Sequence, residues 1–144
     1  MKDSVIRARL PEMIEKAHKM QRQHAEAPIS GHKNGACVLA ENRNGVNDTF
    51  EGCNIELSTS TIIHAERLAL FNAIMHGFIK PLAVIAPEGN NHTKVPVCGY
   101  CRQDYMYLNP DMKVFTVDHA GKVTGEFILR ETLTNPYLSK SKIK

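Results

Sequence analysis

The sequence lacks any apolar run long enough to cross a membrane, although 42% of its 144 residues are hydrophobic. Its first residues lead into a charged amphipathic stretch, so we expect no signal peptide. We therefore expect a cytoplasmic protein with no membrane partner. The formal net charge is only +3, and basic residues gather only near the end of the chain. Because nucleic-acid binders usually carry a basic patch or stripe, we expect no nucleic-acid partner.

Internal repeats and linkers are also missing, and a chain of this length suits one domain with its own core. We predict that the domain covers residues 1–137 and that a basic, flexible tail covers residues 138–144. Two of the four cysteines, Cys98 and Cys101, form a C-x-x-C pair, which in a cytosolic protein indicates a metal or redox site. Cys37 and Cys53 fall in expected strands and are interpreted as buried apolar thiols.

The first part of the chain favours a helix followed by a hairpin. Apolar residues recur at helical spacing over residues 3–25, although Pro11 is expected to bend or interrupt that helix unless it opens it. Residues 34–41 read as a strand with Ala36, Val38 and Ala40 on one face. An Asn- and Gly-rich turn over residues 42–48 then leads into a return strand over residues 49–57.

The rest of the chain alternates between helices and strands. We predict a helix over residues 64–76, ended by Gly77, with apolar faces supplied by Leu68, Ala69, Phe71, Ile74 and Met75. A buried strand over 81–87, a loop over 88–94 and a helix over 98–108 follow, then strands over 112–117 and 123–128 and a short helix over 131–133. This order predicts a mixed sheet covered by helices on both faces.

Three candidate metal ligands stand where the second and third helices are expected to begin. His64 stands at the start of the second helix, and Cys98 and Cys101 stand at the start of the third. One imidazole and two thiolates suit Zn²⁺ and leave its fourth tetrahedral position open for water. Helix N-termini carry partial positive charge, which favours the thiolate form of both cysteines. The pattern predicts a catalytic zinc site.

Glu66 lies two residues after His64, so it can reach water at the metal without being a ligand. H-x-E followed by C-x-x-C is the arrangement of zinc nucleobase deaminases, in which the Glu moves protons. A structural zinc module, the alternative, has no use for such a carboxylate and usually closes with a fourth protein ligand. We therefore predict that Glu66 is catalytic.

Beyond these motifs, the chain resembles the cytidine deaminase family over nearly its full length. The matching stretches are Ala27-Pro28-x-Ser30, Gly35-Ala36, Gly52-Cys53-Asn54-Ile55-Glu56, His64-Ala65-Glu66-Arg67-x-Ala69-Leu70 and Cys98-Gly99-Tyr100-Cys101-Arg102-Gln103. The resemblance implies an α/β fold, a three-layer α/β/α domain with a five-stranded mixed sheet. The last stretch is similar to the free-nucleoside branch, not to the tRNA, guanine or nucleotide deaminases.

The resemblance also implies roles in substrate binding. Asn54 and Glu56 would hydrogen-bond the ribose hydroxyls, and their donors and acceptors suit a diol. The backbone N–H of Ala65 would bind O2 of the base. In relatives with three cysteine ligands, an Arg after the Glu offsets thiolate charge, so Arg67 either has that role or lies only on the helix surface. The resemblance further implies a homotetramer, or a dimer, with sites completed by neighbouring subunits.

Several positions depart from the family pattern. His32 stands where the family has a pocket-lining Phe, Val97 replaces the Pro before Cys98, and Leu57 replaces an Asn. These departures concern sugar and base specificity and leave the metal chemistry intact. We place His32 in the substrate pocket and expect either tolerance of substituted cytidines or an ordinary pocket with compensated substitutions.

Together these features predict a zinc-dependent hydrolase that converts cytidine or deoxycytidine to uridines and ammonia, as in pyrimidine salvage. One alternative is a deaminase of a modified cytosine nucleoside of the blasticidin type, which shares the Cys-Gly-x-Cys-Arg-Gln motif. Asn54 and Glu56 favour an ordinary ribose. Another alternative, a polynucleotide editor, lacks support because the sequence shows no basic groove.

Overall fold

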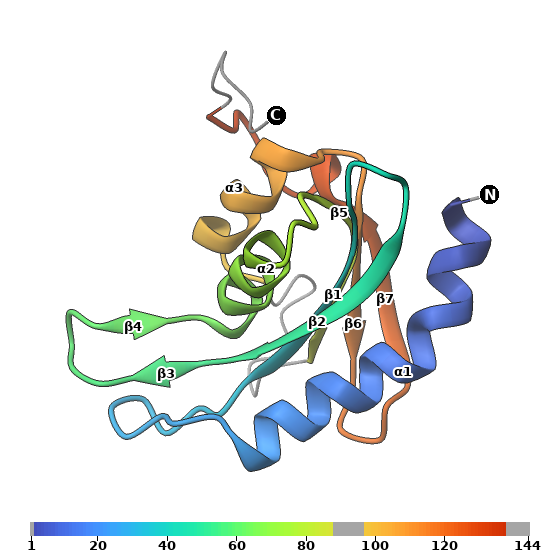
Figure 1. The fold of residues 1–144 in the computed structure, drawn as a ribbon. Helices are drawn as coiled ribbons and strands as arrows, with labels where there is room; N and C mark the ends of the chain where they lie inside the picture. Colours follow the sequence, from blue (N-terminus) through green and yellow to red (C-terminus); the bar gives the residue numbers. More distant parts are fainter. Residues whose placement is uncertain (1, 88–96, 138–144) are drawn as a thin grey trace.

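The computed structural model describes residues 2–87 and 97–137, which form a three-layer α/β/α domain (Figure 1). Helix α1 covers one face of a five-stranded sheet, and helices α2 and α3 cover the other (Figure 1). The elements are α1 Lys2–Gln23, β1 Gly35–Glu41, β2 Asn47–Cys53, β3 Ile55–Glu56, β4 Ile62–Ile63, α2 Ala65–Met75, β5 Lys80–Pro87, α3 Gly99–Leu108, β6 Lys113–Val117, β7 Val123–Ile128 and a 3₁₀ helix, η1, Leu129–Glu131. No described helix combines the length and apolar character needed to span a bilayer.

The sheet is mixed, as predicted, with strand order β2-β1-β5-β6-β7. β1 runs antiparallel to both β2 and β5, β6 runs parallel to β5, and β7 is antiparallel to β6. The parallel pair requires a crossover between β5 and β6, and α3 lies in that connection. α3 therefore begins just beyond the carboxyl end of β5, the edge where open α/β sheets bind ligands.

Strand β1 is buried on both faces and separates two cores. Ala36, Val38 and Ala40 pack on the α2/α3 side, as the alternation predicted. Cys37 and Leu39 point to the other side, toward α1. Cys37 and Cys53 are both buried free thiols, and burial raises the pKa of Cys37 to about 12. The two strand cysteines are therefore structural.

Helix α1 runs without interruption through Pro11. Its axis changes direction part-way along (Figure 1), as expected when a Pro removes one backbone hydrogen bond and crowds the preceding turn. Ile6, Met13 and Ala17 are buried against the sheet. Pro11 by itself favours a break in the helix. Packing of this apolar stripe against the sheet keeps α1 continuous.

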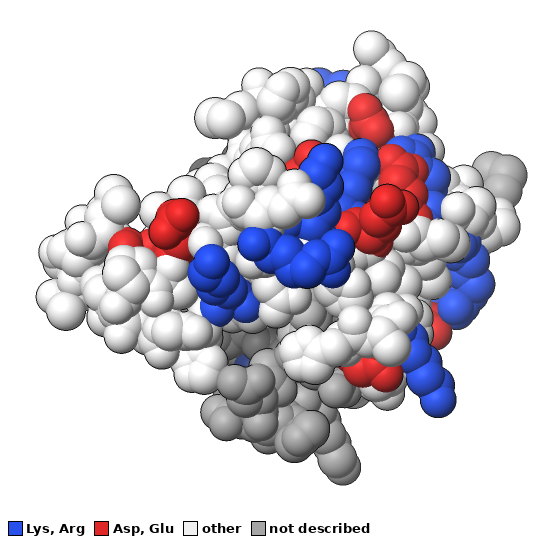
Figure 2. Space-filling model, turned by 90° about the horizontal axis from the view of Figure 1, so that it is seen from below, with Lys and Arg blue, Asp and Glu red and all other residues white. Residues whose placement is uncertain are grey.

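The face of the molecule seen from below in Figure 2 carries both signs of charge. Figure 2 shows basic and acidic side chains next to each other on this face. Ion pairs on α1 account for part of this pattern, with Arg9 and Lys16 both bonded to Glu12 at 2.9 and 3.0 Å. Arg9 also pairs with Asp48 in β2. The mixture agrees with the absence of a basic stripe in the sequence.

Three predicted elements differ from the structure. The return strand over 49–57 ends at Cys53, and after Asn54 the chain enters a separate two-stranded hairpin, β3–β4. In α2, Phe71 and Met75 face solvent, while Ala65, Ala69, Leu70 and Ala73 are buried. The short helix at 131–133 lies instead at Leu129–Glu131. The predicted loop over 88–94 and the predicted tail over 138–144 lie outside the described residues.

Two glycines let the helices approach the sheet closely. A Cβ on Gly35 would collide with the backbone of α1 at Ala17, and one on Gly52 would collide with the backbone of α2 at Ala65 and Ala69. Both glycines belong to the stretches that carried the family resemblance. Gly52 therefore allows β2 to pack closely against the first turn of α2. This turn carries part of the candidate site.

Candidate active site

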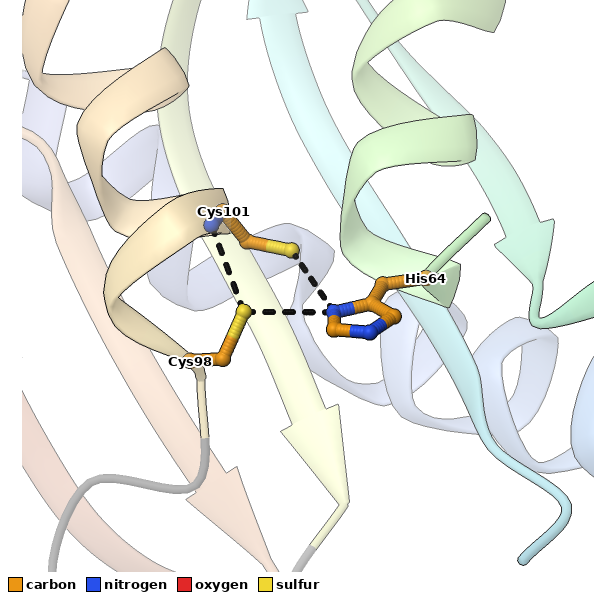
Figure 3. Close-up of side chains that lie close together, drawn as sticks. All are labelled: His64, Cys98 and Cys101. Atoms are coloured by element: carbon orange, nitrogen blue, oxygen red, sulfur yellow. Dashed lines mark hydrogen bonds between the residues drawn. The ribbon is translucent and has the colours of Figure 1, made fainter. Parts of the chain in front are cut away.

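Three candidate ligands converge at the N-termini of α2 and α3 (Figure 3). His64 is the N-cap of α2 and Cys98 is the N-cap of α3, with Cys101 in the first turn of that helix. The His64 Nδ1 atom lies 3.2 Å from Cys98 Sγ and 3.4 Å from Cys101 Sγ. A tetrahedral zinc with usual bond lengths holds N and S ligands about 3.5 Å apart, so Nδ1 and the two sulfurs fit Zn²⁺.

The two thiols are electrostatically linked. Hydrogen bonds from the Cys101 thiol and backbone N–H lower the pKa of Cys98 to about 5. The same pairing with Cys98, together with burial, raises the pKa of Cys101. Without a cation the pair thus favours one thiolate and one thiol, and a divalent metal takes the place of the shared proton. The donor set and the positions of His64, Cys98 and Cys101 therefore fit a bound Zn²⁺.

Glu66 is buried next to these ligands, in the first turn of α2. Loss of hydration raises the pKa of Glu66 to about 7, with a smaller upward effect from the nearby Cys98. A carboxyl that titrates near neutrality can both accept and give up a proton under ordinary conditions. Glu66 therefore has the burial, position and acidity of a proton-transfer group.

A cavity of about 240 Å³ connects these groups with the predicted sugar ligands. Its lining includes every predicted substrate and proton-transfer residue and two of the three metal ligands; the full set is Ser30, His32, Asn34, Asn54, Glu56, His64, Ala65, Glu66 and Cys98. A second cavity of about 290 Å³ lies on the outer side of α2 and α3 and contains none of the metal ligands. The smaller cavity is therefore the candidate active site.

Asn54 and Glu56 hold the loop that forms the opposite wall of the cavity. Asn54 Nδ2 donates to the His32 carbonyl at 2.6 Å, and Asn54 Oδ1 accepts from the Asn34 N–H at 2.8 Å. Glu56 accepts three hydrogen bonds from Ile29 and Ser30, and its pKa is lowered mainly by those from Ser30.

Both side chains keep free hydrogen-bonding capacity after these contacts. The amide of Asn54 has a second N–H and a second lone pair on Oδ1, and a carboxylate such as Glu56 accepts about four hydrogen bonds. One remaining donor and two remaining acceptors match the needs of two neighbouring hydroxyl groups. The pair can therefore bind a diol while it holds the loop.

Arg67 points away from the cavity, to the contact between α2 and α3. Its Nε lies 2.9 Å from Asp104 Oδ2, and its guanidinium lies over the Tyr100 ring at 4.0 Å from the centroid. Asp104 thus balances the charge of Arg67, so the arginine is more than an isolated helix-surface residue. Of the departures from the family pattern, Val97 is buried in the core, whereas Leu57 is exposed on the β3–β4 hairpin.

Ser30 and Asn34 line the cavity although neither was predicted as a site residue. Ser30 belongs to one of the matching stretches, so its polar side chain before a predicted strand was an available signal. Tyr105 was not predicted either; it lies outside the cavity lining, and its hydroxyl donates to the Glu66 carbonyl at 2.5 Å. Nothing in the sequence indicates that contact, because it depends on how α3 packs against α2.

Comparisons with known proteins agree with this geometry. Residues 8–116 match a model of the cytidine and deoxycytidylate deaminase zinc-binding region. Among solved structures, cytidine deaminase from Burkholderia pseudomallei is 30% identical with a TM-score of 0.71, covering 88% of this chain and 98% of that one.

Cytidine deaminases from Mycobacterium leprae and Mycobacterium tuberculosis share the fold. They are 22% and 20% identical, with TM-scores of 0.64 and 0.62. These matches cover 87% and 88% of this chain and 97% and 95% of those chains. The comparison with curated proteins found no match.

Proposed function

Because this chain belongs to the cytidine and deoxycytidylate deaminase family, whose members are hydrolases that act on C–N bonds, we propose that it deaminates cytidine or deoxycytidine to the corresponding uridine. The observation that carries the proposal is a buried carboxylate, Glu66, between a zinc site and a polar cavity. We assign this activity to a domain over residues 1–137.

The residues around the cavity can perform the whole reaction. His64, Cys98 and Cys101 would hold Zn²⁺, a Lewis acid that would lower the pKa of water to about 7. The Glu66 carboxylate accepts a proton from the attacking water and delivers it to N3 of the base, while the water oxygen adds to C4. The Glu66 carboxylate then takes the remaining proton from the new C4 hydroxyl and transfers it to the exocyclic amine. The C4–N bond breaks, and ammonia and a uridine leave.

The polar wall of the cavity favours a nucleoside over a free base. Asn54 and Glu56 would bind the sugar hydroxyls with their free donor and acceptors, and the backbone N–H of Ala65 would bind O2 of the base. The described lining contains two carboxylates, Glu56 and Glu66, and no Lys or Arg. A 5′-phosphate would therefore meet repulsion without a compensating cation, so we favour nucleosides over nucleotides.

We also propose that the pocket tolerates substituents on N4 or C5 of cytidine. His32 lines the cavity and is exposed, and it is smaller and more polar than the Phe that the resemblance places there. A wall that recedes toward solvent can accept a larger group. The structure thus motivates a test of substituted cytidines and of the variant His32→Phe.

We propose a cytoplasmic homotetramer, or a dimer, that acts in pyrimidine salvage. The β3–β4 hairpin projects from the body of the domain (Figure 1) and carries Leu57, which is 75% exposed. Phe71 and Tyr100 add exposed rings on α2 and α3. Apolar side chains of this size are common at subunit interfaces. Sedimentation of the purified protein measures the number of subunits directly.

A substrate panel tests the proposed function. We expect ultraviolet assays to show conversion of cytidine and deoxycytidine, poor conversion of cytosine, and little conversion of deoxycytidine 5′-phosphate. Loss of the sugar contacts costs about 1–3 kcal/mol for each unpaired buried group. Equal efficiency on cytosine and cytidine would contradict the sugar assignment. Inert N4-substituted cytidines, or an unchanged selectivity in His32→Phe, would refute the proposed tolerance.

A further inference from the structure

Tyr105 links the two helices that carry the active site. It lies one turn after Cys101 on α3, and only 1% of its surface is exposed. Its ring packs in the core between the sheet and α2. Its hydroxyl donates to the backbone carbonyl of Glu66 at 2.5 Å, in the first turn of α2.

This contact matters because it is a hydrogen bond from α3 that reaches the backbone of Glu66 itself. Among the described residues, the carboxylate accepts a hydrogen bond from its own backbone N–H and none from another side chain, although the charges of Cys98 and His64 also act on it. The position of the carboxylate therefore follows the position of the first turn of α2. Three features join that turn to α3 among the described residues, namely the ligand His64, the contacts of Arg67 with Asp104 and Tyr100, and the hydroxyl of Tyr105.

The hydroxyl of Tyr105 is a dependable donor. Burial raises the pKa of Tyr105 well above its ordinary value of 10, so the hydroxyl stays protonated at neutral pH. Replacing Tyr by Phe removes the donor and keeps the ring, so packing is nearly unchanged. The Glu66 carbonyl still accepts the helical hydrogen bond four residues on, which limits the effect on folding.

We propose that Tyr105 is a positioning residue for the deamination reaction, which holds the backbone of Glu66 in register with the zinc ligands on α3. It touches neither the substrate nor the reacting atoms. Without its hydroxyl, the first turn of α2 can shift relative to Cys98 and Cys101, and displacements of about 1 Å in a proton-transfer group cost up to about a hundredfold in rate. The inference rests on the proposed function.

The experiment compares Tyr105→Phe with wild type on cytidine. We expect kcat to fall about tenfold or more, with KM within about twofold, because Tyr105 is remote from the sugar-binding wall. Zinc content should stay the same, and the visible spectrum of the cobalt-substituted protein should be unchanged. Tyr107→Phe is the matched control, since Tyr107 lies two residues along the same helix and lines the second cavity, which contains none of the metal ligands.

Each outcome bears on the proposal. A kcat equal to wild type, the same decrease in Tyr107→Phe, or a decrease that follows loss of zinc would overturn the positioning role. If Tyr105→Phe does not fold, Tyr105→Met also lacks the donor and should show the same selective loss of kcat. A wild-type protein that is inactive on every nucleoside would instead refute the proposed function, so the two failures are distinguishable.

Discussion

The two faces of the sheet are packed in different ways. On one face, α1 lies along the sheet as a single helix of 22 residues, and its buried side chains are mainly apolar. On the other face, two helices of 11 and 10 residues begin at the same edge, with His64 and Cys98 as their N-caps. The core beneath them is equally apolar. Because both cores are apolar, the difference in chemistry comes from where the helices begin.

This comparison separates activity from stability. Substitutions at the start of α2 or α3 should reduce turnover with little effect on folding. Substitutions beneath α1 should reduce the free energy of unfolding and leave turnover of the folded protein unchanged. A substitution at the start of α2 or α3 that mainly lowers stability, or one beneath α1 that lowers turnover of the folded protein, would contradict this expectation.

The largest effect is expected for Glu66→Gln. The amide keeps the size of the side chain and cannot carry the proton, so kcat should fall about 10²- to 10⁴-fold. Zinc content should remain at the wild-type level, because Glu66 is not a ligand. Stopped or continuous ultraviolet assays with metal analysis measure both quantities. Glu12→Gln makes the same change on α1 and should leave kcat unaltered; turnover near wild type in Glu66→Gln would assign the proton transfer elsewhere.

Met13→Ala tests the opposite face. Met13 is fully buried between α1 and the sheet. Removing a buried side chain of this size usually lowers the free energy of unfolding by about 2–5 kcal/mol. Urea denaturation measures the change, with Met75→Ala as the control, because Met75 is 78% exposed and its loss should cost less than about 0.5 kcal/mol. A loss of kcat in folded Met13→Ala would show that the faces are coupled.

The smallest effect concerns the ion pairs on α1. Hydrogen bonds from Lys16 and Arg9 lower the pKa of Glu12 to about 2, from an ordinary 4.5. A lowered pKa adds stability above about pH 4.5 that disappears as the pH falls toward 2. Because the Glu12 side chain is 43% exposed, solvent screening limits this to about 0–1 kcal/mol. Glu12→Gln should therefore be slightly less stable than wild type at pH 7 and equal to it near pH 2; a deficit that persists near pH 2 would contradict the ionic origin.

Local patterns predicted much of this molecule. Alternation assigned Ala36, Val38 and Ala40 to one face of β1, and Gly77 ended α2 as expected. The motif spacing brought His64, Cys98 and Cys101 together, because both motifs stand at helix starts. These features depend on residues that are close in the sequence or on a pattern specific to one family.

Features that depend on distant contacts could not be predicted. The break at Asn54 follows from hydrogen bonds between its side chain and the loop at His32 and Asn34. α2 is apolar on several sides, so periodicity could not decide that Phe71 faces solvent. The bond from Tyr105 to Glu66 joins two helices that are 39 residues apart in sequence at that point.

Metal content and cytidine turnover, measured on one sample purified without chelator, test the central claim most directly. We predict about one zinc per chain and conversion of cytidine to uridine with an equal amount of ammonia. Chelation should abolish turnover and added zinc should restore it, while Cys98→Ala should hold no zinc and show no activity. A protein that contains no zinc, or a zinc-loaded protein that leaves cytidine unchanged, would contradict the account.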